Sequence, residues 1–224
     1  MKLLNLYSGT GSVSKPWREK GYEVFDVDVD PRFSPEYCGD ILQWDYTKLH
    51  FIPDVIWASP PCDQYSRCRT TGGPRNLRLA DSLVAKGLEI IAYFEKLNPA
   101  LIWFCENGAT TLLWEREVAK TLTSYVILDY CQYGEEILYR KRTRISHSPA
   151  LHWEPRRLCD KKTCHAVVNG RHRKSAQQGP ICKNCKTAEE RKADSCSKDQ
   201  LHALPKQLTE EILQVCENHI WTLL

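Results

Sequence analysis

Apolar residues in the first 147 positions fall into two alternating patterns, and this alternation predicts an α/β fold. Short apolar runs of strand length cover 2–7, 23–27, 54–58, 100–105, 125–130 and 144–146. Between the middle runs, apolar residues at 79, 83, 84, 88, 91 and 94 have the spacing of one helix face. Strands that alternate with helices usually build a parallel sheet with right-handed crossover connections. We therefore expect residues 1–147 to fold as one α/β domain.

The periodic pattern ends near residue 148 and returns only close to the C-terminus. Residues 148–200 are dominated by Lys, Arg, Cys, His and Gln, and they contain too few large apolar side chains to build a core alone. Residues 204–213 read as the start of a helix. We expect a small, basic, Cys-rich and loop-rich insert at 148–200, followed by a C-terminal helix within 201–224 that packs back on the α/β domain.

Charge is distributed unevenly along the chain, although the net charge is only +3. Residues 154–200 contain twelve Lys and Arg against six Asp and Glu, so the remainder of the chain is mildly acidic. A basic segment on an acidic body favours contact with a polyanion, and a solvated charged loop is the alternative.

The chain contains eleven cysteines, an odd number, and several lie in strand-like apolar runs. With no visible secretion signal, they read as reduced thiols of an intracellular protein. Five of them read as small buried or partly buried hydrophobic residues: Cys38, Cys68, Cys105, Cys131 and Cys216. No apolar run reaches the length of about 18 residues that a transmembrane helix requires, so no membrane contact is expected.

One cysteine is different, because Ser59-Pro60-Pro61-Cys62 directly follows the apolar run 55–58. The two prolines hold the backbone extended and end the strand, which places the thiol on a rigid loop at a strand's carboxyl end. Open α/β sheets bind their ligands there. A free thiol has a pKa of about 8.5, so attack needs activation, and Arg67 and Arg69 are close enough in sequence to favour the thiolate. From these residues alone, Cys62 can be interpreted either as a structural thiol or as a nucleophile.

A glycine-rich turn, Gly9-Thr10-Gly11, follows the first expected strand. Such a turn lets a ligand approach the backbone at a helix N-terminus, but the third glycine of the dinucleotide pattern is missing and a plain turn is the alternative. Asp28 lies at the end of the second expected strand, near the place where such folds hold a ribose diol. Asp40, at the next strand end, is the candidate for an adenine amino group; a turn carboxylate is the alternative for both.

Two further motifs carry charged side chains. Glu106-Asn107 ends the run 100–105, where a carboxylic acid behind aromatic residues is suited to donate a proton, while a helix cap by Asn107 is the alternative. Arg140, Arg142 and Arg144 alternate, so in a strand they share one face and suit a phosphate or carboxylate. The alternative is that the three arginines lie on a solvent-exposed edge strand and bind no ligand.

The order and spacing of these four motifs resemble the C5-cytosine-specific DNA methyltransferases, in particular the compact members found in phages and other viruses. The similar segments are Tyr7-Ser8-Gly9-Thr10-Gly11, Pro60-Pro61-Cys62 with Tyr65-Ser66, Glu106-Asn107, Arg140-x-Arg142-x-Arg144, Gly170-Arg171-His172 with Ala176-Gln177, and Ala203-Leu204-Pro205. The chain departs from the family pattern at Asp63 and Gln64 after the nucleophile, at Gly108, and at Arg140, where Gln is usual.

The resemblance implies a Rossmann-like sheet that binds S-adenosylmethionine, with residues 1–147 as the catalytic, cofactor-binding domain. It implies transfer of a methyl group to C5 of a flipped cytosine in double-stranded DNA through a covalent adduct with Cys62. Glu106 would protonate or hydrogen-bond N3, while Arg142, supported by Arg144, would hold the base carbonyl or Glu106. The implied cofactor-binding residues are Tyr7, Ser8, Gly9, Thr10, Gly11, Asp28, Asp40 and Pro60.

The resemblance also makes residues 148–200 the target-recognition segment. DNA contacts are expected from Ser66, Arg67, Arg69, Arg171, Arg173 and Lys174, and those of the last three are expected mostly to phosphates. Within the segment, the pairs Cys159–Cys164 and Cys182–Cys185 have a spacing that suits a tetrahedral structural zinc ion. His165 and His172 are alternative ligands, and a reduced, metal-free loop is the alternative to zinc.

Three other functions remain open from the sequence. An RNA cytosine-5 methyltransferase would use the same catalytic set, and a zinc-containing DNA-binding protein with impaired catalysis would keep the fold. An amino-methyltransferase shares the cofactor fold but normally has an aromatic residue where Cys62 stands. The expected location is intracellular, in the cytoplasm of a prokaryotic host or the nucleus or cytoplasm of a virus-infected cell. No obligate protein partner is evident.

Overall fold

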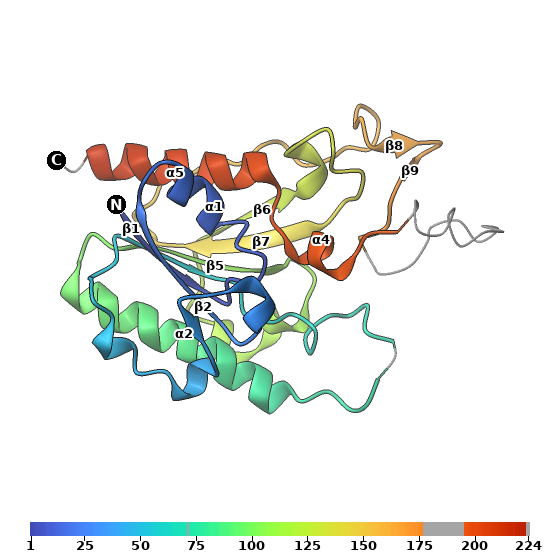
Figure 1. The fold of residues 1–224 in the computed structure, drawn as a ribbon. Helices are drawn as coiled ribbons and strands as arrows, with labels where there is room; N and C mark the ends of the chain where they lie inside the picture. The colour runs from blue at the N-terminus through green and yellow to red at the C-terminus, as the bar shows by residue number, and fades with distance from the viewer. Residues whose placement is uncertain (71, 177–194, 223–224) are drawn as a thin grey trace.

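A central seven-stranded sheet organises the protein in the computed structural model, which describes residues 1–70, 72–176 and 195–222 (Figure 1). The strand order is β3-β2-β1-β4-β5-β7-β6, and only β7 runs antiparallel to its neighbours. The strands are β1 (Lys2–Leu6), β2 (Glu23–Asp28), β3 (Tyr37–Cys38), β4 (Val55–Ala58), β5 (Ile102–Gly108), β6 (Tyr125–Asp129) and β7 (Arg142–His147). The predicted α/β sheet is confirmed.

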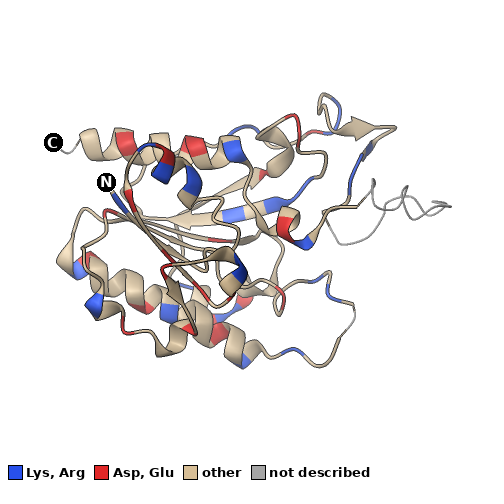
Figure 2. Ribbon diagram, in the orientation of Figure 1, with Lys and Arg blue, Asp and Glu red and all other residues tan. Residues whose placement is uncertain are grey.

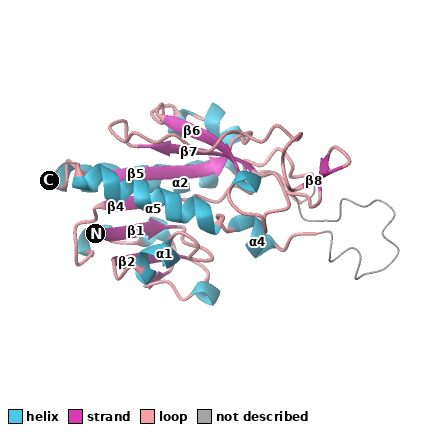
Figure 3. Ribbon diagram, turned by 90° about the horizontal axis from the view of Figure 1, so that it is seen from above, coloured by secondary structure: helices cyan, strands magenta, loops and turns pink. Residues whose placement is uncertain are grey.

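Helices cover both faces of this sheet. α1 (Ser14–Glu19) and α5 (Lys206–Trp221) lie on one face and α2 (Leu77–Leu97) on the other, as Figures 1 and 3 show from two directions. Consecutive strand residues point to opposite faces, so Leu3 packs into the cluster under α5 while Leu4 packs under α2. This two-sided burial explains why the strands read as continuous apolar runs rather than as alternating ones.

Two strands have bounds that differ from the sequence prediction. β5 does not end at residue 105 but continues through Glu106 and Asn107, because both pair with β7. β7 begins at Arg142, so Arg140 precedes the strand. Glu106 therefore lies within a strand, and not on a loop. This strand forms hydrogen bonds with β4 on one edge and with β7 on the other.

The C-terminal helix α5 is fixed to the start of the chain. Its buried residues Leu208, Ile212 and Cys216 join the core cluster under the sheet. Glu217 accepts hydrogen bonds from Lys20 Nζ (2.7 Å) and from the Tyr22 hydroxyl (2.8 Å). The contact closes one face of the sheet with residues from both ends of the described chain.

The segment that follows β7 contains little regular structure. Its described part forms one small hairpin of β8 (Val167–Val168) and β9 (Arg171–His172), and a short helix α4 (Lys198–His202) comes shortly before α5. Asn169 and Gly170 have φ values of 51° and 74°, which is the backbone of a tight two-residue hairpin turn. Within the described residues, no helix is long and apolar enough to cross a membrane.

Candidate active site

The Cys62 loop is anchored where β1, β4 and β5 end. Ser59 donates its backbone N–H to Leu6 (3.2 Å), and Asn107 Nδ2 donates to the Pro60 carbonyl (3.0 Å). The Cys62 carbonyl accepts from the backbone of Tyr65 and Ser66, closing a turn after the thiol. Since Pro60 and Pro61 cannot continue the ladder, these contacts hold the thiol at the carboxyl edge of the sheet.

Lys141, Glu106 and Asp63 are the charged groups that act on the Cys62 thiol. Burial raises the pKa of Cys62 above its ordinary value, the positive charge of Lys141 lowers it, and the carboxylates of Glu106 and Asp63 raise it. Lys141 Nζ lies 4.0 Å from Glu106 Oε1, and Glu106 is only 7% exposed. The site thus combines a half-buried thiol, a buried carboxyl group and a nearby cation.

Sequence reasoning missed Lys141. β5 pairs Glu106 with Ile145, so residues 141, 143 and 145 of the neighbouring strand and its approach share the face of Glu106. The alternation of side chains was the available signal, but without the pairing register it pointed equally to the three arginines. Arg67, one of the residues expected to activate the thiol, instead binds Glu115 and the Thr110 carbonyl.

Arg142 and Arg144 lie on the other face of β7 from Glu106. Arg142 donates two hydrogen bonds to Asp129, at 2.9 and 2.7 Å, and Asp129 is 0% exposed. The Arg144 guanidinium stacks between the rings of Trp114 and Tyr125, at 4.1 and 3.7 Å from their centroids. The structure therefore pairs Arg142 with Asp129 and not with Glu106, and direct catalytic roles for the two arginines stay predictions.

The glycine-rich turn after β1 has the backbone that the sequence predicted for a ligand loop. Tyr7, Gly9 and Gly11 have φ values of 60°, 49° and 69°. A Cβ at either glycine would meet no atom within 4 Å, so the peptide surface is open. The buried Ser8 hydroxyl has no hydrogen-bond partner among the described residues. An open peptide edge beside an unpaired hydroxyl is suited to a polar ligand.

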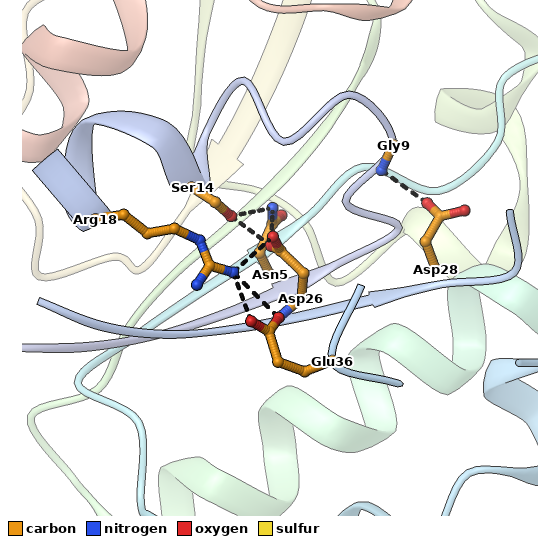
Figure 4. A network of polar contacts seen from close by, with 7 residues as sticks. All are labelled: Asn5, Gly9, Ser14, Arg18, Asp26, Asp28 and Glu36. Atoms are coloured by element: carbon orange, nitrogen blue, oxygen red, sulfur yellow. Dashed lines mark hydrogen bonds and ion pairs between the residues drawn. The ribbon is translucent and has the colours of Figure 1, made fainter. Parts of the chain in front are cut away.

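Asp28 joins this loop to the end of β2, because its carboxylate accepts from the Gly9 N–H at 2.7 Å (Figure 4). The same carboxylate accepts from the Asp30 N–H at 2.9 Å. Each carboxylate oxygen keeps a second lone pair for a ligand hydroxyl. Asp40 follows β3, accepts from the Leu42 N–H at 3.0 Å and is exposed. Both carboxylates predicted for the cofactor therefore stand at neighbouring strand ends.

A buried network on Asp26 sets the position of α1 against the sheet. Asp26 accepts hydrogen bonds from Ser14 Oγ, from Asn5 Nδ2 (2.9 Å) and from Arg18 (3.0 Å), and Arg18 also binds Glu36 (Figure 4). With these partners, Asp26 is a structural carboxylate. By holding α1, the network also fixes the turn that precedes this helix, which leaves Asp28 as the carboxylate that faces the glycine loop.

The loop after Cys62 is closed by its own side chains. Arg75 donates to the carbonyls of Gln64 (2.6 Å) and Ser66 (2.8 Å), and Arg69 donates to the carbonyl of Gly73 (3.0 Å). Gln64, which departs from the family pattern, accepts from the Asn76 N–H at 2.8 Å. The departure at Gln64 thus supplies a contact that shapes the loop.

The residues predicted to contact DNA differ in their surroundings. Ser66 Oγ accepts from the Cys68 N–H at 3.2 Å, and Arg67 and Arg69 hold neighbouring loops. Arg171 and Arg173 are exposed and Lys174 is half-buried at the β8–β9 hairpin. Figure 2 shows Lys and Arg side by side along the start of β7 and near this hairpin. The exposed Arg171 and Arg173 are therefore on the insert, whereas Arg67 is exposed on the loop after Cys62 and is paired with Glu115.

Three thiols and one imidazole converge beside β6. The ligand atoms of Cys131, Cys159, Cys164 and His172 all lie within 4.8 Å of one another. Cys159, Cys164 and His172 were candidates from the sequence, whereas Cys131 read as a small hydrophobic residue. Cys182 and Cys185 lie outside the described residues, as does Gln177, while His165 is not part of this group.

Of the remaining cysteines expected to be buried, two behave as predicted and two do not. Cys105 and Cys216 are buried, but Cys38 and Cys68 are exposed. Cys38 lies on β3, the edge strand, and Cys68 lies on the loop after the nucleophile, where no helix or strand covers it.

A curated viral protein is similar to this chain over most of its length. It is the probable DNA (cytosine-5)-methyltransferase of Frog virus 3 (isolate Goorha), 36% identical over 160 residues that cover 65% of this chain and 69% of the relative. The chain belongs to the DNA (cytosine-5)-methyltransferase family. No protein-family model matches it. Membership in this family makes the protein an enzyme of the methyltransferase class, with an α/β sheet as its catalytic core.

Two solved methyltransferase structures are similar in fold to this cytosine-5 methyltransferase family member. They are the Dnmt2 methyltransferase of S. pombe, with a TM-score of 0.45, 16% identity and coverage of 75% of this chain and 57% of that chain, and a mutant DNMT2 of Spodoptera frugiperda, with a TM-score of 0.41, 17% identity and coverage of 71% and 53%. The chain thus spans little more than half of each solved structure, and likeness at this level does not bear on the substrate.

Proposed function

We propose that this protein transfers a methyl group from S-adenosylmethionine to C5 of cytosine in double-stranded DNA. The observation that carries the proposal is the Cys62 thiol, which Asn107 holds at the carboxyl edge of the sheet beside Glu106, in a chain of this family. A half-buried thiol beside a carboxyl group is suited to nucleophilic attack on a pyrimidine ring, because the thiol can add to the ring while the carboxyl group supplies a proton. The base must leave the duplex to reach such a buried site.

Cytosine C5 is a weak nucleophile until a thiolate adds to C6. In the proposed reaction the Cys62 sulfur forms a bond to C6, and the electron pair of the C5–C6 double bond moves toward N3. Glu106 stabilises this charge by protonating or hydrogen-bonding N3. C5 would then take the methyl group while the sulfur–methyl bond of the donor breaks, which would release S-adenosylhomocysteine. Loss of the C5 proton to a base would re-form the C5–C6 double bond and expel Cys62 as a thiolate, and N3 would return to Glu106 any proton it had taken.

Lys141 is the cation that this site supplies near both groups. Its positive charge lowers the pKa of Cys62 and so opposes the effect of burial, which raises it. Lys141 Nζ also donates to the carbonyl of Leu201, a residue of α4, at 3.0 Å. We therefore assign Lys141 the role of favouring the Cys62 thiolate, and we keep Arg142 and Arg144 as candidates for contacts with the base.

The cofactor is assigned to the glycine loop and the neighbouring strand ends. When bound, S-adenosylmethionine supplies an electrophilic methyl group. The open peptide edge of Gly9-Thr10-Gly11 and the unpaired Ser8 hydroxyl fit the amino and carboxylate groups of its methionine part. The Asp28 carboxylate fits the ribose diol, and Asp40 fits the adenine amino group. Tyr7 follows β1 and Pro60 follows β4, and because these parallel strands are neighbours, both residues stand at the same edge of the sheet as the glycine loop.

Target recognition is assigned to the insert. The exposed Arg171 and Arg173, together with Lys174, stand at the β8–β9 hairpin on a segment with an excess of positive charge. Such side chains bind phosphates, so the affinity for DNA should fall as the salt concentration rises. Because the insert has few large apolar side chains, a structural zinc ion is part of the proposal. A DNA substrate places the activity inside the cell, in a bacterial or virus-infected host.

The test is incubation of the purified protein with S-adenosylmethionine and a mixed duplex DNA library, followed by base-resolution mapping of 5-methylcytosine. Cys62→Ser should abolish the product, while Cys68→Ser, at an exposed thiol of the same loop, should keep it. A parallel reaction with structured RNA decides the substrate. Methylation of RNA alone, methylation of an exocyclic amine, or product formation by Cys62→Ser would each overturn the proposal.

A further inference from the structure

The four residues Cys131, Cys159, Cys164 and His172 come from three separate parts of the fold. Cys131 follows β6 of the catalytic sheet, Cys159 and Cys164 flank a short loop of the insert, and His172 lies on β9. The Cys159 sulfur lies 3.5 Å, and the Cys164 sulfur 3.7 Å, from His172 Nε2. Chain segments distant in sequence thus bring three sulfur atoms and one imidazole nitrogen within 4.8 Å of one another.

These distances match a tetrahedral zinc ion. Zinc binds sulfur at about 2.3 Å and imidazole nitrogen at about 2.0 Å, so tetrahedral angles put a sulfur and a nitrogen ligand about 3.5 Å apart. The two sulfur-to-nitrogen distances in the structure lie within about 0.2 Å of this value. Three thiolates and one imidazole form a closed structural set of ligands, which leaves no position for a reacting water.

The surroundings of the cluster hold the ligands in place. The Asp160 carboxylate accepts the backbone N–H groups of Lys162 (2.9 Å) and Thr163 (3.0 Å), which shapes the loop between the two cysteines of the insert. Gln132 Nε2 donates to the sulfurs of Cys131 (3.8 Å) and Cys164 (3.9 Å). Such N–H donors to sulfur stabilise the negative charge of metal-bound thiolates and orient them.

A contact also leads from the cluster to the catalytic sheet. The Cys159 backbone N–H donates to Asp129 Oδ2 at 3.1 Å, and the same buried carboxylate holds Arg142 with two hydrogen bonds. A metal that fixes Cys159 would therefore also fix Asp129, and through it the start of β7. The Cys-rich segment would be attached to the sheet at Cys131 rather than folded separately.

We propose that Cys131, Cys159, Cys164 and His172 bind one zinc ion that clamps the insert to the catalytic sheet and positions Arg142 through Asp129. Four ligands complete a tetrahedral set, so the proposed site requires neither Cys182 nor Cys185. Zinc supplies the folding free energy that the small insert lacks in apolar surface. The site is structural, so it does not depend on the methyl-transfer proposal.

Metal content of the purified full chain tests the ligand set. The wild-type protein should carry one zinc ion per chain, and the cobalt-substituted protein should show the visible absorption of a tetrahedral thiolate site. Cys131→Ala should lose the metal. Cys216→Ala, which truncates an equally buried cysteine of α5, should keep it. Cys182→Ala combined with Cys185→Ala should also keep it.

His172→Cys guards against simple misfolding, because it replaces one zinc ligand by another and should retain zinc, whereas His172→Ala should not. Amide hydrogen exchange at Cys159 should speed up when zinc is removed from the wild-type protein. A metal-free wild type, a disulfide between these thiols, or zinc lost with Cys182 and Cys185 but kept without Cys131 would overturn the site. Unchanged exchange at Cys159 would overturn the clamp.

Discussion

Replacement of Asn107 by Ala should uncouple the nucleophile from the sheet. Asn107 is 1% exposed, its Nδ2 donates to the Pro60 carbonyl at 3.0 Å, and its Oδ1 accepts from the Gly108 N–H at 3.0 Å and from Thr111 Oγ1 at 3.2 Å. The bond to Pro60 is the side-chain contact that connects the strand carrying Glu106 to the loop carrying Cys62. Asn107→Ala removes this donor without adding bulk.

The expected loss follows from burial and bond count. A buried group left without its hydrogen-bond partner costs about 1–3 kcal/mol, so the three contacts together predict a loss of about 2–4 kcal/mol in the free energy of unfolding. About 1.4 kcal/mol of this free energy comes from the Pro60 contact, and its loss favours release of the Cys62 loop. An increase of about 1.36 kcal/mol in a barrier lowers a rate by a factor of ten. Formation of the Cys62 adduct should therefore slow by about tenfold or more.

Asn98 offers a matched control at the other end of the same strand. Asn98 Nδ2 donates to the Pro53 carbonyl at 3.0 Å, and its Oδ1 accepts from the Ala100 N–H at 3.1 Å. Asn98→Ala removes a similar amide–proline contact before β4 begins, far from the thiol. It should lower the free energy of unfolding by a similar or smaller amount and leave the rate of adduct formation unchanged.

The assay combines urea unfolding with single-turnover trapping on duplex DNA that contains 5-fluorocytosine, which cannot lose its C5 substituent as a proton. The covalent complex is counted on a denaturing gel as a function of time. Equal rates of trapping in Asn107→Ala and the wild type would refute the anchoring role of Asn107. Equal slowing in Asn98→Ala would show that the effect is general destabilisation.

The remaining predictions concern charge. Lys141→Gln should move the midpoint of Cys62 alkylation to higher pH, because the Lys141 charge lowers the pKa of this thiol. Arg142→Gln should destabilise the protein by about 3 kcal/mol, at the lower end for a broken buried pair because the Arg142 side chain is 37% exposed, and adding Asp129→Asn should restore much of it in urea unfolding. Burial works to raise the pKa of Glu217, but its hydrogen bonds lower it overall, so its contribution to stability is complete above the ordinary pKa of 4.5 and is lost as the pH falls through the folded value. Replacing Glu217 by Gln should remove this acid-side slope from the unfolding free energy measured against pH.

Each charge prediction has an outcome that contradicts it. Arg67→Gln is the control for Lys141, since Arg67 binds Glu115, and it should leave the alkylation midpoint of Cys62 in place. A midpoint that moves with Arg67 and not with Lys141 would return the activating role to the arginine. Additive losses in the two charge variants of the buried pair would show that Arg142 and Asp129 do not interact. An acid slope that persists without Glu217 would assign it to another carboxylate.

Elements with a local cause could be predicted from the order of the residues. The prolines before Cys62 end a strand whatever lies around them, and the glycines after β1 permit a backbone with positive φ. Apolar runs of strand length between helical spacings predicted the sheet and α2. The candidate nucleophile, the cofactor loop and the carboxylates at the strand ends follow from such short-range rules, and the structure brings Cys62 and Glu106 together at one edge.

The tertiary structure alone decided which side chains meet across the sheet. The pairing of Glu106 with Ile145 turns Lys141, and not Arg142, toward the carboxyl group, since a shift of one residue in register would exchange the two faces. In the same way, Cys131 joins Cys159, Cys164 and His172 only because β6 ends beside the insert. Register and the docking of distant segments depend on the sum of many non-local contacts, so no local pattern of residues contains them.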